Sequence, residues 1–251
     1  MLDAAQYRLL RRLSPADPPY MMCPRAYEEQ SKLQVLLGDL LGDVRGKTVI
    51  DFGCGDGLEA LELVRRGADR VIGVDLNLGC IEIARWYAAQ AHITEDRLEF
   101  AFETTATADV VISIDSFEHF GDPAGTLRTI HDLLRPNGVL VASFGPPWFH
   151  PLGGHLFSLF PWAHLLFSEA ALIRWRNDLR EDRPATFAEA GLNRMTVRRF
   201  ERLVAASEFE VECLDVVPIR RVARFHNRLT REFFTSVVRS RLRKRDHPND
   251  A

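Results

Sequence analysis

The nine residues VIDFGCGDG, Val49 to Gly57, decide the fold of this chain of 251 residues. They continue an apolar strand expected over 47–52 into a turn with glycines at alternate positions, 53, 55 and 57. Glycine permits positive φ and lets a ligand approach the backbone with no Cβ in the way. A helix is expected after the turn, as far as about Arg66. This order predicts a ligand site at the carboxyl end of a parallel strand.

Strand and helix patterns alternate through the following residues. Further strands are expected at 70–74, 98–102, 109–114 and 139–144, and helices at 78–90 and 122–134. Asp122 and Thr196 are the expected N-caps of two helices, the second of which extends to Ser207. Segments 209–217 and 234–242 alternate as two last strands, although a basic helix is possible for the second. The pattern predicts an α/β, Rossmann-like, doubly wound sheet.

Three acidic residues, Asp51, Asp56 and Asp75, indicate the kind of ligand that the turn binds. Asp75 ends the second strand, where its carboxylate can accept hydrogen bonds from a ribose diol. Carboxylates beside the pyrophosphate of a dinucleotide would repel it, whereas they would attract a cationic sulfonium and an amino group. An NAD-dependent dehydrogenase is therefore a weak alternative, and the G-x-G-x-G spacing also disfavours it.

Composition restricts the class of protein further. The four cysteines are widely spaced without a C-x-x-C pair, which disfavours a disulfide framework or zinc site and favours a reducing cytoplasm. No run of 18 apolar residues exists, so no transmembrane segment is expected, and the N-terminus lacks the pattern of a signal peptide. The formal net charge of -3 combines −9 over 1–173 with +6 over 174–251. The sequence predicts no oligomeric state.

Four motifs together resemble the class I S-adenosylmethionine-dependent methyltransferases, especially their small-molecule branch. Besides the glycine turn these are Gly73-Val-Asp-Leu-Asn77, Asp115-Ser-Phe-Glu-His-Phe120 and Leu133-Leu-Arg-Pro-Asn-Gly138. The resemblance covers 47–144 and implies S-adenosyl-L-methionine as cofactor. It also implies a seven-stranded sheet that ends in an antiparallel pair, in agreement with the last two expected strands.

The resemblance also assigns roles to residues of the cofactor site. The methionine moiety would be cradled by Asp51, Gly53, Cys54, Gly55 and Gly57. Asp75 would bind the ribose hydroxyls, Leu76 would pack on adenine, and Glu103 is the candidate acid after the third strand. Asp115, at the end of the fourth strand, is the last predicted cofactor contact.

Candidate catalytic residues are Glu118, His119 and His150, of which His119 is the expected proton acceptor, since imidazole titrates near neutrality. The spacing of Asp115, Glu118 and His119 is similar to the metal-binding pattern of ubiquinone-pathway O-methyltransferases and small-RNA 2′-O-methyltransferases, with Asp in place of Glu at the first position. His150 or His155 could complete such a set of Mg²⁺, Mn²⁺ or Zn²⁺ ligands. Because Asp115 departs from the pattern, no metal is predicted.

We expect one methyltransferase domain with an N-terminal helical cap (1–45), a cofactor-binding core (46–144), a lid or substrate insert (145–194) and the end of the sheet (195–251). The cap would hold at most a short opening helix and then one helix from Glu28 to Leu41. The insert is rich in aromatic residues, namely Trp148, Phe149, Phe157, Phe160, Trp162 and Phe167. More than half of them are expected to form the insert's own core, and the rest an apolar surface for the acceptor.

The function predicted is transfer of a methyl group to a small organic acceptor, hydrophobic or aromatic, with oxygen slightly preferred over nitrogen or carbon. A nucleic-acid methyltransferase is one alternative, because Arg220 to Arg245 contains ten basic residues and one acid. It is not favoured, since 29 of the 32 basic residues of the whole chain are arginine and no Asn-Pro-Pro-Tyr-type motif follows the fourth strand. A catalytically inactive, methyltransferase-like binding scaffold is the other alternative.

Overall fold

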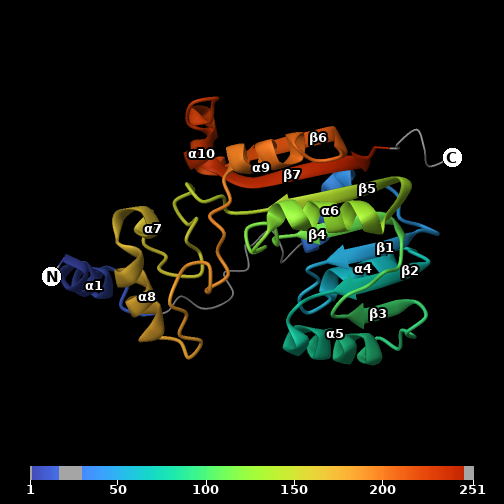
Figure 1. The fold of residues 1–251 in the computed structure, drawn as a ribbon, viewed down its shortest axis with the longest axis horizontal. Coiled ribbons are helices and arrows are strands. Elements are labelled where there is room, and N and C mark those ends of the chain that lie inside the picture. Colours follow the sequence, from blue (N-terminus) through green and yellow to red (C-terminus); the bar gives the residue numbers. More distant parts are fainter. Residues whose placement is uncertain (1, 17–29, 246–251) are drawn as a thin grey trace.

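The computed structural model describes residues 2–16 and 30–245, and seven strands form its central sheet (Figure 1). The strands are β1 (Thr48–Phe52), β2 (Arg70–Val74), β3 (Leu98–Ala101), β4 (Ala108–Ile114), β5 (Leu134–Phe144), β6 (Phe209–Pro218) and β7 (Thr235–Lys244). Their order is β3-β2-β1-β4-β5-β7-β6, and β7 runs in the opposite direction to the other six strands. The predicted seven-stranded sheet with an antiparallel end is confirmed.

Helices cover both faces of the sheet, because strands buried on both sides need two apolar layers. One face carries α3 (Lys32–Leu36), α4 (Leu58–Arg65) and α5 (Leu78–Gln90), and the other carries α6 (Pro123–Leu133) and α9 (Val197–Ala205). Successive residues of β1 alternate between them, since Val49 packs in the first core and Ile50 in the second. The predicted caps are present, with Asp122 accepting from Gly125 N at 3.0 Å and Thr196 from Arg199 N at 3.1 Å.

The insert forms a third core, together with the N-terminal helix. Helices α7 (Ala163–Leu166) and α8 (Glu169–Asn177) of the insert lie beside α1 (Leu2–Leu13), beyond one end of the strands (Figure 1). Leu10 of α1 packs in this core, and the indole Nε1 of Trp175 donates to Ser14 O at 2.7 Å. The first 45 residues therefore contribute to two different cores, since Leu33 and Leu36 of α3 pack under the sheet.

Three predicted elements differ in extent from those observed. The opening helix has 12 residues, because the insert buries its Leu10. The helix expected from Glu28 to Leu41, whose first two residues are outside the described ranges, is α3 followed by the 3-10 turn η1 (Gly38–Leu40), since Gly38 adopts φ +52°. Strand β5 begins at Leu134 because this residue pairs with Ala108.

Within the described ranges, no helix has the length and apolarity to cross a membrane.

Candidate active site

Backbone N–H groups of the glycine turn donate hydrogen bonds to the end of β2 and to the residue that follows it. Gly53 N and Cys54 N both donate to Val74 O, at 2.8 and 3.1 Å, and Gly55 N donates to Asp75 Oδ2 at 2.9 Å. Asp75 Oδ1 accepts from Asn77 N at 2.8 Å. The turn and the second strand therefore hold each other in place, which is how residues 20 positions apart come to line one cleft.

The glycines of the turn serve two different purposes. All three have positive φ, which L side chains rarely adopt. A Cβ at Gly57 would lie 2.6 Å from Phe100 Cζ, so this glycine permits close packing of α4 on β3. A Cβ at Gly55 would meet no atom of the described residues within 4 Å. The backbone at Gly55 is therefore open, as binding of a ligand against it requires.

The turn opens into a cleft of about 1520 Å³ at the carboxyl ends of β1, β2 and β4. Carboxylates dominate its wall, and they are Asp51, Asp56, Glu59, Asp75, Glu103, Asp115, Asp122 and Asp132. The cationic residues of the wall are Lys32 and Arg128. This excess of negative charge favours a cationic ligand over an anionic one.

Asp51 is the most buried carboxylate of the cleft, with 2% of the residue exposed. Its Oδ2 atom has no hydrogen-bond partner among the described residues, a costly state for a buried group. Burial raises the pKa of Asp51 well above its usual value, nearby Glu59 raises it further, and Lys32 opposes both. A bound ammonium group would satisfy this oxygen, so the residues fit the amino group of S-adenosylmethionine.

The other predicted cofactor residues also lie at this cleft. Asp75, Leu76 and Glu103 line it, and Leu76 is 76% exposed, which leaves a large apolar side chain free to cover a base. Cys54 lines it too, but burial raises the pKa of its thiol, and the residue is almost wholly enclosed. Phe102, which directly follows β3 and is 49% exposed, is a lining residue that sequence analysis missed. The sequence could have indicated Phe102, because it directly precedes Glu103, which was predicted to lie at the cofactor site.

Asp115 directly follows β4 in a left-handed conformation, φ 49°, which is uncommon for a residue with a side chain. Its Oδ2 atom lies 3.1 Å from Lys32 Nζ, which reaches the cleft from α3. Burial raises the pKa of Asp115, and Lys32 partly offsets this effect. Lys32 is a second residue of the cleft that sequence analysis missed, because no motif surrounds it.

Glu118 is buried behind the cleft wall rather than lining it. Its Oε1 accepts from Gly145 N at 3.0 Å, and its carbonyl accepts from Asn193 N at 3.0 Å, so it contacts both ends of the insert. Burial and then the charge of Asp115 raise the pKa of Glu118 to about 8. This geometry is that of a residue that positions the loop after β4.

His119, in contrast, lines the cleft and is exposed. Its Nδ1 lies 2.6 Å from the carbonyl oxygen of Gly191, so Nδ1 carries the proton and Nε2 is the basic nitrogen. Desolvation lowers the pKa of His119, which favours the neutral ring. His155 Nε2 lies 3.4 Å from His119 Nε2, and burial lowers the pKa of His155 to about 3.

His150 lies apart from these groups. Its Nδ1 accepts from Leu152 N at 2.9 Å, within a turn of the insert, and the residue does not line the cleft. The structure thus brings together two of the three predicted catalytic residues, Glu118 and His119, and places His155 with them instead of His150. Ligand atoms of these three residues lie within 4.8 Å of one another, close enough to share a metal ion, whereas Asp115 faces Lys32.

The aromatic residues of the insert do not line this cleft. Trp148, Phe157 and Phe167 are buried in the insert's own core, and Phe149 and Phe160 pack against it, so more than half of the six belong to this core as expected. The insert contacts the cleft's edge through the Gly191 carbonyl and through Asn193, whose Nδ2 donates to Phe117 O at 2.6 Å and Phe120 O at 2.8 Å. A role as a lid stays a prediction.

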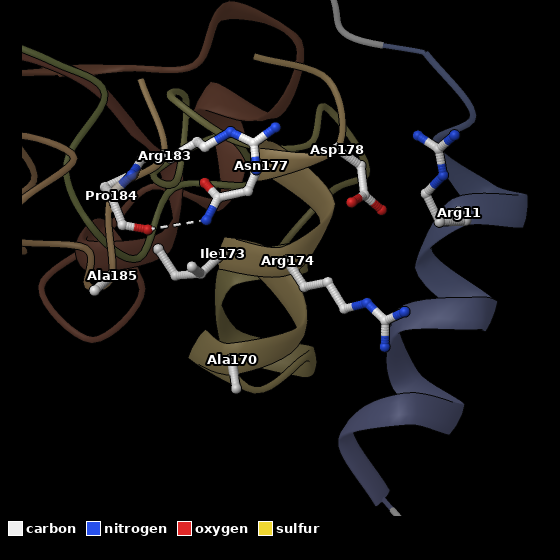
Figure 2. A pocket seen from close by; sticks show the side chains of 9 residues that line it. All are labelled: Arg11, Ala170, Ile173, Arg174, Asn177, Asp178, Arg183, Pro184 and Ala185. Carbon is white, nitrogen blue, oxygen red and sulfur yellow. Dashed lines mark hydrogen bonds between the residues drawn. The ribbon is translucent and has the colours of Figure 1, made fainter. Parts of the chain in front are cut away.

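A second hollow, of about 920 Å³, lies between α1 and α8 (Figure 2). Arg174 and Asp178, from α8 and its C-terminal end, extend toward Arg11 of α1, and the guanidinium of Arg174 also lies 4.0 Å above the ring of Tyr7. Tyr7 in turn donates its hydroxyl hydrogen to Asp178. None of the predicted site residues lines this hollow, so its contacts are those of two helices packed together.

Comparisons with known proteins agree with this geometry. Residues 25–214 match the family described as "Methyltransferase domain". A ubiquinone biosynthesis O-methyltransferase of Neisseria meningitidis is 37% identical over 107 residues, which are 40% of this chain and 45% of that protein. The matched segment thus spans less than half the length of this curated relative.

Two solved structures are similar in fold. An S-adenosylmethionine-dependent methyltransferase from Mesorhizobium loti matches with a TM-score of 0.56 and 18% identity, over 83% of this chain and 95% of that one. Magnesium protoporphyrin IX methyltransferase from Synechocystis, with bound S-adenosylmethionine, matches with a TM-score of 0.55 and 13% identity, over 96% and 91%. Because the family match covers most of the sequence, the chain belongs to the methyltransferase-domain family, which confirms the predicted class of S-adenosylmethionine-dependent methyltransferases.

Proposed function

We propose that the protein transfers the methyl group of S-adenosylmethionine to an oxygen atom of a small apolar or aromatic acceptor. The observation that carries the proposal is the tautomer of His119. Because Gly191 O holds the Nδ1 proton, Nε2 is the basic atom of this cleft-lining residue, and it lies 3.4 Å from Nε2 of His155. A hydroxyl must lose its proton as it is methylated, and a neutral imidazole in this position can accept it.

Other features support the cofactor and the acceptor class. The acidic cleft suits a sulfonium and an ammonium group, and the open backbone at Gly55 leaves room for them. The relative from Neisseria meningitidis is named an O-methyltransferase of ubiquinone biosynthesis, which supports oxygen as the acceptor atom. Phe52, Phe102 and Phe120 supply the aromatic part of the cleft wall.

The test is a transfer assay with S-adenosylmethionine and a panel of catechols, phenols, aliphatic alcohols and amines, in which S-adenosylhomocysteine is measured. We expect turnover with a hydroxylated aromatic acceptor, and a loss of about 10²–10⁴ in rate for His119→Ala. His92→Ala, at an exposed position after α5, is the matched control. Turnover of amines alone, or unchanged rates in His119→Ala, would contradict the proposal.

A metal-assisted reaction is a second candidate, favoured by the proximity of Glu118, His119 and His155. Carboxylate and imidazole ligands suit Mg²⁺, Mn²⁺ or Zn²⁺, and such an ion would polarise the acceptor oxygen. Exhaustive chelation separates the two mechanisms. Activity that survives chelation and still depends on His119 supports the imidazole as base, whereas activity restored only by a divalent ion supports the metal.

A further inference from the structure

The segment between β6 and β7 carries an unusual combination of exposed side chains. It contains the 3-10 helix η2 (Arg220–Phe225) and the short helix α10 (Arg231–Phe234), and it projects from the end of the sheet (Figure 1). We define the η2 surface by its exposed arginines, Arg220, Arg221, Arg224 and Arg228, and by its exposed apolar residues, Phe225 and Leu229.

The positive charge of the η2 surface is not neutralised within the described part of the chain. None of its four arginines has an ion-pair partner there, and residues 219–230 contain no acid. The strand β7 behaves differently, because Arg239 pairs with Asp215, and Arg241 and Arg243 both pair with Glu212. Among the residues that the structure describes, four arginines without an ion-pair partner therefore lie together on the η2 surface.

The two apolar side chains of the η2 surface are exposed to water, which is energetically unfavourable for large apolar groups. Leu229 is 83% exposed and Phe225 is 49% exposed, and the guanidinium of Arg224 lies 4.6 Å above the ring of Phe225. Arginines interleaved with large apolar side chains are typical of segments that lie in the interface of a membrane, where cations meet headgroups and apolar groups meet acyl chains.

Strand register places the η2 surface on the same edge of the sheet as the cleft. Phe144, the last residue of β5, pairs with Val238, and Pro218 pairs with Thr235. The connection from Pro218 to Thr235 therefore begins where the parallel strands end. It also contacts the insert, since the ring of Phe233 lies 5.4 Å from that of Phe149.

We propose that the η2 surface docks the protein on an anionic lipid bilayer. The edge of the sheet at which the parallel strands end would then face the membrane. Nucleic acid would satisfy the arginines, but the aliphatic side chain of Leu229 offers nothing to a phosphate or a base. A bilayer satisfies both kinds of side chain. The proposal adds a membrane as the source of an apolar acceptor, and it does not depend on which acceptor is methylated.

Vesicle sedimentation tests the proposal, with phosphatidylcholine vesicles and with vesicles of equal parts phosphatidylcholine and phosphatidylglycerol. We expect the full chain to bind the anionic vesicles at least about tenfold more tightly, and added salt to weaken this binding. The double variant Arg224→Gln/Arg228→Gln should bind them roughly tenfold more weakly. Phe225→Ser/Leu229→Ser should also bind more weakly, with a defect that persists at high salt.

The matched control is Arg65→Gln/Arg202→Gln, which removes the same charge from exposed positions on α4 and α9. Equal vesicle binding by the control and the Arg224→Gln/Arg228→Gln variant would overturn the proposal. So would tight, salt-sensitive binding of RNA or DNA by a wild-type protein that ignores the vesicles. Calorimetry with S-adenosylhomocysteine keeps this result separate from the proposed function. Because none of the substituted residues lines the cleft, every variant should bind S-adenosylhomocysteine with the affinity of the wild type.

Discussion

The cofactor cleft and the insert differ in how the chain builds them. The cleft is made by residues at the ends of adjacent parallel strands, joined by backbone hydrogen bonds such as Gly53 N to Val74 O. The insert is held by side chains from distant segments, as when Trp175 donates to Ser14 O. Local sequence order is enough to place the first kind of residue, whereas the second kind depends on tertiary packing.

The largest expected effect is on the insert. Trp175→Ala removes a fully buried indole, and we expect it to lower the free energy of unfolding by about 3–5 kcal/mol. If the cleft is independent of the insert core, the affinity for S-adenosylhomocysteine stays near that of the wild type. Denaturant unfolding and calorimetry measure the two quantities. A loss of affinity for S-adenosylhomocysteine together with the loss of stability would show that the two regions form one cooperative unit. If Trp175→Ala does not fold, Phe187→Leu is a milder variant for the same test.

Asp75→Ala is the converse variant, since it affects the cleft and leaves the insert core intact. It removes the acceptor of Gly55 N and Asn77 N as well as the predicted partner of the ribose hydroxyls. We expect the dissociation constant for S-adenosylhomocysteine to rise roughly a hundredfold, or about 3 kcal/mol. Asp96→Asn, at an exposed position before β3, is the control for the loss of one charge. Unchanged affinity in Asp75→Ala would remove Asp75 from the cofactor site.

Asp51 links stability to cofactor binding through its raised pKa. In the ligand-free protein, the pKa of Asp51 is higher in the folded than in the unfolded chain. The contribution of Asp51 to the free energy of unfolding is therefore most favourable below about pH 4 and falls as pH rises above that value. Asp51→Asn should therefore increase the free energy of unfolding at pH 8 by about 1–3 kcal/mol.

The cofactor's ammonium group requires ionised Asp51, so wild-type affinity should increase with pH while binding releases a proton. Calorimetry in buffers of different ionisation enthalpy measures this release. The Asp51→Asn variant should bind more weakly and lose the proton release. Equal proton release in both proteins would contradict the role given to Asp51.

The smallest expected effect concerns the paired arginines of β7. Glu212→Gln leaves Arg241 and Arg243 without their acid, and we expect a loss of at most about 1 kcal/mol in the free energy of unfolding, smaller at high salt. Glu210→Gln is the control, because its exposed carboxylate lies on the same strand. Equal effects of the two substitutions would indicate that these ion pairs contribute nothing measurable.

The candidate site shows where sequence reasoning succeeds and where it stops. Asp51, Gly55 and Asp75 were identified from their places at strand ends, which topology alone brings to one edge. Lys32 was missed, because it comes from a helix outside the motifs and enters the cleft through the way α3 packs. His150 was chosen over His155 as a catalytic residue, although only the fold of the insert decides which of the two imidazoles faces His119.

Sequence by itself determined the order of strands and helices, the glycine turn and the acidic character of the cleft. These features depend on periodicity and on residues within one strand–turn–helix unit, where neighbours in sequence are neighbours in space. Tertiary structure alone decided that α1 completes the insert core, that Gly191 O sets the tautomer of His119, and that the arginines of β7 pair with acids of β6. Each of these depends on a contact between residues far apart in the chain, and no local pattern encodes such a contact.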